Sequence, residues 1–196
     1  MVPRYYRGRM SYTVRSLHAD EWPRAKALRL EALRDPVASI AFMETYESAV
    51  ARPDSYWQEL SERRAEGASG TQQIIAAGPD GEWVGTVTVV MEEAGTTDWA
   101  GLPVERRQGH LVGVYVQPGH RGIGLTEVLF DAALEWAWAQ GAERVRLLVH
   151  EDNARALRAY RKAGFVETGV TTTLGPAPDE RELELAVERP DPESDL

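Results

Sequence analysis

The chain has 196 residues, 43% hydrophobic and 27% charged, which suits a single globular domain with a buried core. It has no cysteine, which excludes disulfide bonds, thiolate metal ligands and cysteine nucleophiles. The formal net charge of −9 argues against a general nucleic-acid-binding protein, and no apolar run approaches the roughly 20 residues that cross a bilayer. We therefore expect a cytoplasmic monomer or homodimer that binds neither nucleic acid nor membrane.

The first half of the chain predicts strands and helices by its hydrophobic periodicity and its turn residues. Residues 1–10 are expected to be a flexible basic extension, and either Met1 or Met10 could be the native start. The predicted elements are a strand at 12–17, a helix at 20–34, an ambiguous segment at 39–50, a helix at 55–66, a hairpin of strands 73–77 and 82–91, and a polar loop at 92–108.

The second half alternates strands with helices until two final strands follow one another. The predicted elements are a strand at 110–117, a helix at 122–140, a strand at 144–149, a helix at 153–163, strands at 165–173 and 181–187, and a disordered acidic tail at 189–196. The resulting order β-α-α-β-β-β-α-β-α-β-β predicts one α/β domain over residues 11–188. Its mixed central sheet should carry helices on both faces.

The most informative stretch is VYVQPGHRGIGLTEVLF, residues 114–130, in which a buried strand runs through glycines into an amphipathic helix. Gly122 and Gly124 let the backbone approach a ligand, and the free N–H groups at the start of the helix attract anions. Arg121 adds donors suited to phosphate. This stretch could bind a diphosphate on the backbone amides of residues 122–126. Alternatively, it is only a tight turn between strand and helix that carries a surface arginine. The glycine spacing fits neither a P-loop nor a dinucleotide fingerprint.

Two motifs in this half resemble those of the GNAT superfamily of acetyltransferases. Arg121-x-x-Gly124-x-Thr126 is similar to its motif A, with Thr126 where Gly or Ala is usual. Asn153-x-x-Ala156-x-x-x-Tyr160-x-x-x-Gly164-Phe165 is similar to motif B at the expected distance. The resemblance is strong over about residues 110–170 and implies a GNAT-like sheet that binds acetyl-coenzyme A (acetyl-CoA) as acyl donor, with no metal.

By this resemblance the coenzyme lies between two strands that splay apart, and its pantetheine arm pairs with strand backbone near Val114 and Val116. Gly113 is expected to form a bulge that helps the splay, with a packing role as the alternative. Asn153 could contact the coenzyme or only cap its helix. The predicted coenzyme-binding residues are Val114, Val116, Arg121, Gly122, Ile123, Gly124, Leu125, Thr126, Asn153, Ala156 and Tyr160.

The implied reaction is direct attack of a neutral amine on the thioester, which needs an oxyanion donor, a general acid and a base. The resemblance assigns the first two to the Val114 N–H and to Tyr160. A histidine is the natural near-neutral base, and strict alternation would place the His110 side chain on the same side as Val114. Glu92 and Glu93 are rivals, acting through water.

The resemblance implies a primary amine acceptor, on a small molecule or a protein, but does not identify it. The segments expected to border the acceptor are residues 92–108 and 170–180 together with Phe42, Met43, Thr45 and Tyr46, which could equally be core. The alternative function is a non-catalytic sensor that binds acyl-CoA. Tyr160 favours the enzyme, since a sensor has no need of a general acid.

Overall fold

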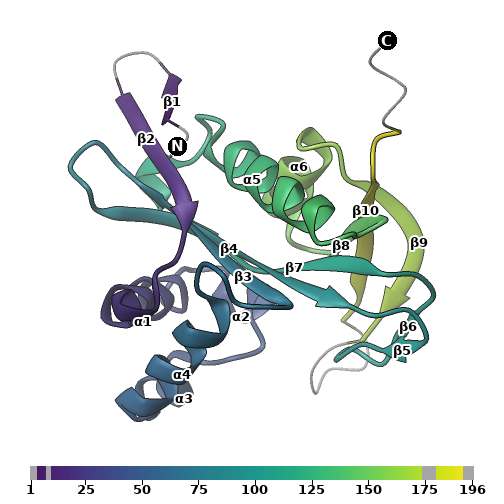
Figure 1. Ribbon diagram of the computed structural model, residues 1–196, viewed down its shortest axis with the longest axis horizontal. Coiled ribbons are helices and arrows are strands. Elements are labelled where there is room, and N and C mark those ends of the chain that lie inside the picture. The colour runs from purple at the N-terminus through teal and green to yellow at the C-terminus, as the bar shows by residue number, and fades with distance from the viewer. Residues whose placement is uncertain (1–3, 8–9, 174–179, 192–196) are drawn as a thin grey trace.

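The computed structural model describes residues 4–7, 10–173 and 180–191. One sheet runs through the whole molecule in the order β1-β2-β3-β4-β7-β8-β10-β9 (Figure 1). Its strands are β1 (Arg4–Arg7), β2 (Met10–Ser16), β3 (Thr71–Ala77), β4 (Trp83–Glu92), β7 (Gln108–Val116), β8 (Arg144–His150), β9 (Val166–Thr172) and β10 (Glu182–Glu188). Neighbouring strands are antiparallel except β7 and β8, which are parallel, so the sheet is mixed as predicted.

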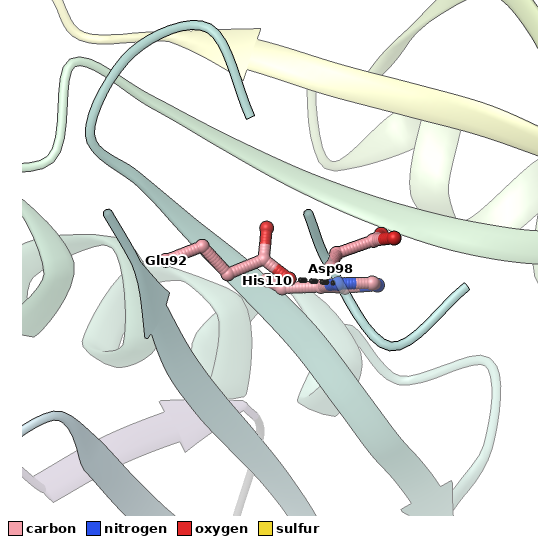
Figure 2. Close-up of side chains that lie close together, drawn as sticks. All are labelled: Glu92, Asp98 and His110. Atoms are coloured by element: carbon pink, nitrogen blue, oxygen red, sulfur yellow. Dashed lines mark hydrogen bonds and ion pairs between the residues drawn. The ribbon is translucent and has the colours of Figure 1, made fainter. Parts of the chain in front are cut away.

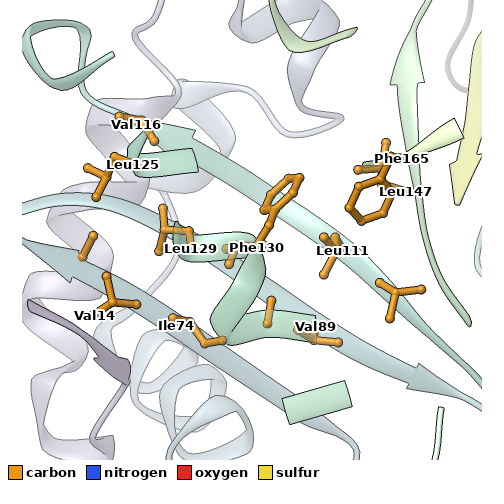
Figure 3. Packing of buried hydrophobic residues seen from close by; sticks show 14 of the residues in the cluster. Val14, Ile74, Val89, Leu111, Val116, Leu125, Leu129, Phe130, Leu147 and Phe165 are labelled. Carbon is orange, nitrogen blue, oxygen red and sulfur yellow. The ribbon is translucent and has the colours of Figure 1, made fainter. Parts of the chain in front are cut away.

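Helices cover both faces of this sheet, also as predicted (Figure 1). They are α1 (Trp22–Ala32), α2 (Ala38–Ala41), α3 (Tyr46–Val50), α4 (Asp54–Arg64), α5 (Leu125–Ala139) and α6 (Ala154–Lys162). Side chains alternate between the two faces of the sheet, so neighbouring residues pack into different helix layers. Ile74 packs against the layer of α5 and α6, and Ile75 packs against α1. Figure 3 shows the larger cluster, in which Phe130 of α5 lies near Leu111 of the sheet and Leu129 lies nearer Val14 and Ile74.

Several short elements differ from the sequence predictions. Within the expected flexible extension, Arg4–Arg7 forms β1 and pairs with β2, while residues 1–3 and 8–9 lie outside the described residues. The expected polar loop at 92–108 contains a small hairpin, β5 (Thr96–Thr97) and β6 (Pro103–Val104). The ambiguous segment 39–50 contributes α2 and α3. Much of the expected tail, 192–196, and residues 174–179 lie outside the described residues.

The helix predicted from residue 122 begins three residues later, at Leu125. Pro118–His120 forms a short 3-10 turn, and Gly124 adopts a φ of 87° as the N-cap of α5. A positive φ cannot continue a right-handed helix, so the glycines belong to the turn. In the part of the chain that the structure describes, no helix combines the length and apolarity needed to cross a membrane.

A bulge in β7 confirms the prediction for Gly113. Thr88 pairs with Val112 but Thr86 pairs with Tyr115, so β7 carries one extra residue there, and Gly113 has a φ of 63°. A bulge inverts the side-chain alternation beyond it. The prediction that His110 shares its side of the sheet with Val114 and Val116 is therefore wrong: both valines pack with the α5 cluster, together with Leu111, which neighbours His110.

The parallel pairing of β7 with β8 ends early. Cα partners run from Gln108 and Arg144 to Leu111 and Leu147, and no described pair follows. The bulge begins two residues later. The two strands therefore separate towards their C-terminal ends and open the centre of the sheet.

Candidate active site

A cleft of about 980 Å³ occupies the opening between β7 and β8. Residues 111–116 of β7 line one side and residues 147–150 of β8 line the other. Its walls also include α1, α2 and α4 on one face of the sheet, and α5 and α6 at the other end. This volume lies at the upper end of the range for ligand sites, which suits a large cofactor together with a second substrate.

The start of α5 forms one end of the cleft. Gly122, Gly124, Leu125 and Thr126 line it, whereas the Ile123 side chain packs against the core. Gly122 and Gly124 have φ values of 74° and 87°, which only glycine adopts readily. The first N–H groups of a 15-residue helix therefore face a concave space, an arrangement that favours anions.

Arg121 is held by protein groups in this structure. Its Nε donates to the Val116 carbonyl at 2.7 Å, and its guanidinium forms an ion pair with Asp35, whose side chain is 2% exposed. Arg155 of α6 lies 3.6 Å from the same carboxylate. Burial raises the pKa of Asp35, but the hydrogen bond and charge of Arg121 outweigh it and lower that pKa overall. Asp35 thus fixes the arginine beside the cleft.

Helix α6 contributes the opposite wall of this end. Asn153 caps the helix, since its side chain accepts a hydrogen bond from the Ala156 N–H at 3.2 Å, and it also lines the cleft with Ala156 and Tyr160. The Tyr160 ring stacks on Phe130 with 5.4 Å between centroids. Burial raises the pKa of Tyr160, so its phenol stays protonated at any working pH.

His110 of β7 lies just before the point where β7 and β8 separate, and its side chain contacts Glu92 (Figure 2). The imidazole is 1% exposed, and its Nδ1 is 2.9 Å from Glu92 Oε1. Burial raises the pKa of Glu92, but hydrogen bonds from His110 and Gln108 and the charge of Arg146 lower it to about 2. An ionised Glu92 accepts the Nδ1 proton, which leaves Nε2 as the basic nitrogen. Among the described residues Nε2 has no partner.

Arg146 anchors Glu92 within a buried charge network. Its guanidinium lies 2.8 Å from Glu92, 2.5 Å from Asp98 and 2.8 Å from Glu184, and all four side chains are at most 8% exposed. The ligand atoms of Glu92, Asp98 and His110 lie within 4.8 Å of one another (Figure 2), a spacing that could hold a metal ion. Arg146 already supplies the positive charge that both carboxylates need.

Sequence reasoning did not identify Asp98, Arg146 or Glu184. The available signal was an arginine within the apolar strand RVRLLVH, because a buried charge requires a partner. Trp99, in the predicted polar loop, stacks on His110 with 5.6 Å between ring centroids and is 51% exposed. The rival Glu93 is exposed and forms an ion pair with Arg107, away from the cleft.

Of the residues predicted to border the acceptor, some line the cleft and others pack in the core. Phe42, Met43 and Thr45 line the cleft, whereas Tyr46 packs against the small cluster under α3 and α4. Trp99 lines the cleft from the β5–β6 hairpin. Of the third segment, residues 174–179 lie outside the described residues.

Residues 19–165 match the model of the acetyltransferase (GNAT) family. The chain belongs to this family. Over 77 residues it is 36% identical to mycothiol acetyltransferase of Beutenbergia cavernae, covering 39% of this chain and 26% of that protein. Over 113 residues it is 32% identical to streptothricin acetyltransferase of Streptomyces lavendulae, covering 56% and 54%. The chain thus spans about a quarter and about half of these two relatives.

The fold agrees with solved GNAT structures. The structure of yncA from Salmonella typhimurium, solved with its cofactor acetyl-CoA, superimposes with a TM-score of 0.67 at 16% identity, covering 92% of this chain and 98% of that one. This likeness shows that the two chains share the fold.

Proposed function

We propose that this GNAT protein transfers the acetyl group of acetyl-CoA to a primary amine by direct attack. One observation carries the proposal: a single cleft joins the glycine-rich start of α5 to the His110–Glu92 pair through the gap between β7 and β8. Acetyl-CoA fits the first end by charge, because its diphosphate is an anion. The yncA structure with acetyl-CoA supports the choice of donor.

The coenzyme would run from the turn before α5 along the end of β7. Its diphosphate binds the amides of residues 122–126, where Ile123 contributes only its backbone. Arg121 is engaged by Asp35, so it positions this turn and contributes positive charge from the side. Pantetheine lies along Val114 and Val116, whose strand no longer pairs with β8. Asn153 and Ala156 border it from α6.

In this proposal the Val114 N–H, just beyond the bulge, serves the oxygen of the reacting carbonyl. The thioester oxygen gains negative charge as the amine attacks, and a fixed N–H at about 2.7–3.1 Å would stabilise it. The Val114 N–H lies beyond the last β7–β8 pair, in the part of β7 that lines the cleft.

His110 removes a proton from the acceptor, directly or through one water, and Glu92 holds its ring in the active tautomer. Glu92, the rival base, is a poorer one because its pKa of about 2 keeps it a weakly basic carboxylate. It is therefore a positioning residue in this reaction.

Tyr160 supports departure of the coenzyme thiolate. Because burial raises its pKa, the phenol stays protonated and can donate a hydrogen bond, but it gives up its proton reluctantly to a thiolate whose thiol pKa is about 8.5. Its main contribution is thus a hydrogen bond that strengthens as charge develops on sulfur. The relatives named above are acetyltransferases, which disfavours the sensor alternative.

The test is a panel of primary amines incubated with protein and acetyl-CoA, with detection of free thiol. At least one amine should release thiol above the hydrolysis background, with formation of the acetamide. Tyr160→Phe should then lower kcat by about 10²-fold with little change in coenzyme affinity. The matched control is Tyr46→Phe, outside the cleft. Acetamide formation with no amine, or equal loss of kcat in both variants, would contradict the proposal.

A further inference from the structure

Arg64 reaches the acceptor side of the cleft from α4. Trp57, Leu60, Ser61 and Arg64 recur at three- and four-residue spacing and line the cleft as one helix face. The Arg64 carbonyl accepts a hydrogen bond from Gln72 Nε2 at 3.3 Å, which anchors the end of α4 to the start of β3.

This anchoring sets the distance to the reacting centre. Strand β3 is separated from β7 only by β4, and Gln72 is level with Val89 and Leu111 in the ladder. Two strand spacings amount to about 10 Å, a span that the long arginine side chain partly bridges. An acceptor whose amine approaches His110, the neighbour of Leu111, can therefore extend towards Arg64.

Arg64 forms no close ion pair within the part of the chain that the structure describes, and the charge of Glu44 acts on it only from a longer distance. Among the described residues no ion pair or side-chain hydrogen bond to its half-buried guanidinium is present, although the group faces the cleft. The neighbouring carboxylate, Glu44, is shared by Arg29 at 3.2 Å and Arg52 at 3.0 Å. Arg29, Arg52 and Arg64 thus have the single carboxylate of Glu44 between them, which leaves a local excess of positive charge although the whole chain carries a net charge of −9.

Burial makes this excess positive charge unfavourable. It lowers the pKa of both Arg64 and Arg29, which means that their charged forms are poorly solvated. Beside them the Nε1 of Trp57, a residue 3% exposed that also lines the cleft, is a buried donor without a partner in the described chain. Unpaired buried donors and charges are costly unless a ligand supplies the acceptor.

We propose that the amine acceptor also carries a carboxylate, which Arg64 binds at the α4 side of the cleft. This inference rests on the proposed acetyl transfer and narrows its acceptor to amino acid-like compounds. A carboxylate matches the planar guanidinium with two parallel hydrogen bonds, and its single charge balances Arg64, the arginine of this cluster that forms no ion pair with a described residue. The amine end then lies towards His110 and the carbonyl of the bound thioester.

The test uses matched pairs of acceptors that differ only in charge. Glycine, 4-aminobutyrate and 6-aminohexanoate are each compared with their primary amides, and the series also measures the amine-to-carboxylate span. Wild-type protein should prefer at least one acid over its amide by about 10–100-fold in kcat/KM. Arg64→Gln should abolish this preference by lowering kcat/KM for the acid far more than for the amide, and Arg64→Lys should restore part of it. Arg63→Gln, on the exposed side of α4, is the control.

A second measurement separates this inference from the proposed function. The acids alone are titrated into the coenzyme-free protein by calorimetry, with wild type, Arg64→Gln and Arg63→Gln in parallel. Binding that only Arg64→Gln weakens supports the carboxylate site even if no amine is acetylated. Acetylation of acids and amides at equal rates overturns the carboxylate site while the transferase stands. Absence of both turnover and binding overturns both.

Discussion

At the scale of single residues, the chemistry of the cleft depends on how His110 is oriented. Glu92 accepts the Nδ1 proton, Trp99 stacks on the ring, and Nε2 is left without a protein partner among the described residues. A carboxylate paired with an imidazole both fixes its tautomer and stabilises its protonated form. The electrostatics of the pair can therefore be read from the pH dependence of the rate.

We expect Glu92→Gln to lower kcat/KM, because the ring of His110 loses the carboxylate that holds its tautomer and is held less firmly. His110→Ala should remove the acidic limb of the kcat/KM profile altogether. The measurement is kcat/KM for one acetylated amine between about pH 5 and 9, a range that brackets an ordinary histidine.

The matched control is the adjacent Glu93→Gln, because Glu93 is exposed and bound to Arg107 instead of His110. Its profile should overlay the wild type. An acidic limb that stays in place in His110→Ala would assign the base to another group.

At the scale of secondary-structure elements, Arg146 of β8 holds together segments that are distant in sequence. Its three carboxylate partners belong to β4, to the β5–β6 hairpin and to β10. The pair with Asp98 fixes the hairpin and thereby keeps Trp99 over His110. The network is thus both a structural link and part of the support for the catalytic histidine.

Arg146→Met should lower the free energy of unfolding by about 3–5 kcal/mol, since it leaves buried carboxylates without a partner. Arg161→Met is the control, because its ion pair with Glu167 is exposed and should contribute at most about 1 kcal/mol. Urea denaturation of both variants gives the comparison. If both variants lost the same free energy of unfolding, the buried network would stabilise the fold no more than an exposed ion pair does.

The sequence could predict what depends on neighbouring residues. Alternation, turn residues and helix periodicity located the main strands and helices, and the glycine pattern located the turn before α5. It could not locate the Arg146 network, because the partners are 38 to 54 residues apart and only the sheet order brings them together. The prediction that the side chains of His110 and Val114 share one side of the sheet was wrong for a related reason. The bulge at Gly113 was expected, but its inversion of the side-chain alternation was not taken into account.

At the scale of the whole molecule, the separation of β7 and β8 makes one continuous cleft through the sheet. Helices α5 and α6 bound one end of it, and α1, α2 and α4 bound the other. Arginines line both ends, Arg121 and Arg155 near α5 and Arg29 and Arg64 near α4, and at each end they share a single carboxylate, Asp35 or Glu44. More guanidinium groups than carboxylates at each end favour an anionic group of a ligand there.

Acetyl-CoA should therefore raise the melting temperature, because it binds the folded state and not the unfolded chain. At a ligand concentration 100 times Kd the stabilisation is about 2.7 kcal/mol, which corresponds to a rise of roughly 5–10 °C for a chain of this length. Pantetheine, which lacks the diphosphate, should give a much smaller shift of the melting temperature.

Thr126→Glu should reduce the shift of the melting temperature that acetyl-CoA causes, because it places a negative charge at the amides of α5. Ala139→Glu adds the same charge at the far end of that helix and should keep the wild-type shift, each variant being compared with its own ligand-free protein. Equal shifts in the two variants would place the diphosphate elsewhere, and no shift with millimolar acetyl-CoA would remove the donor from the proposal.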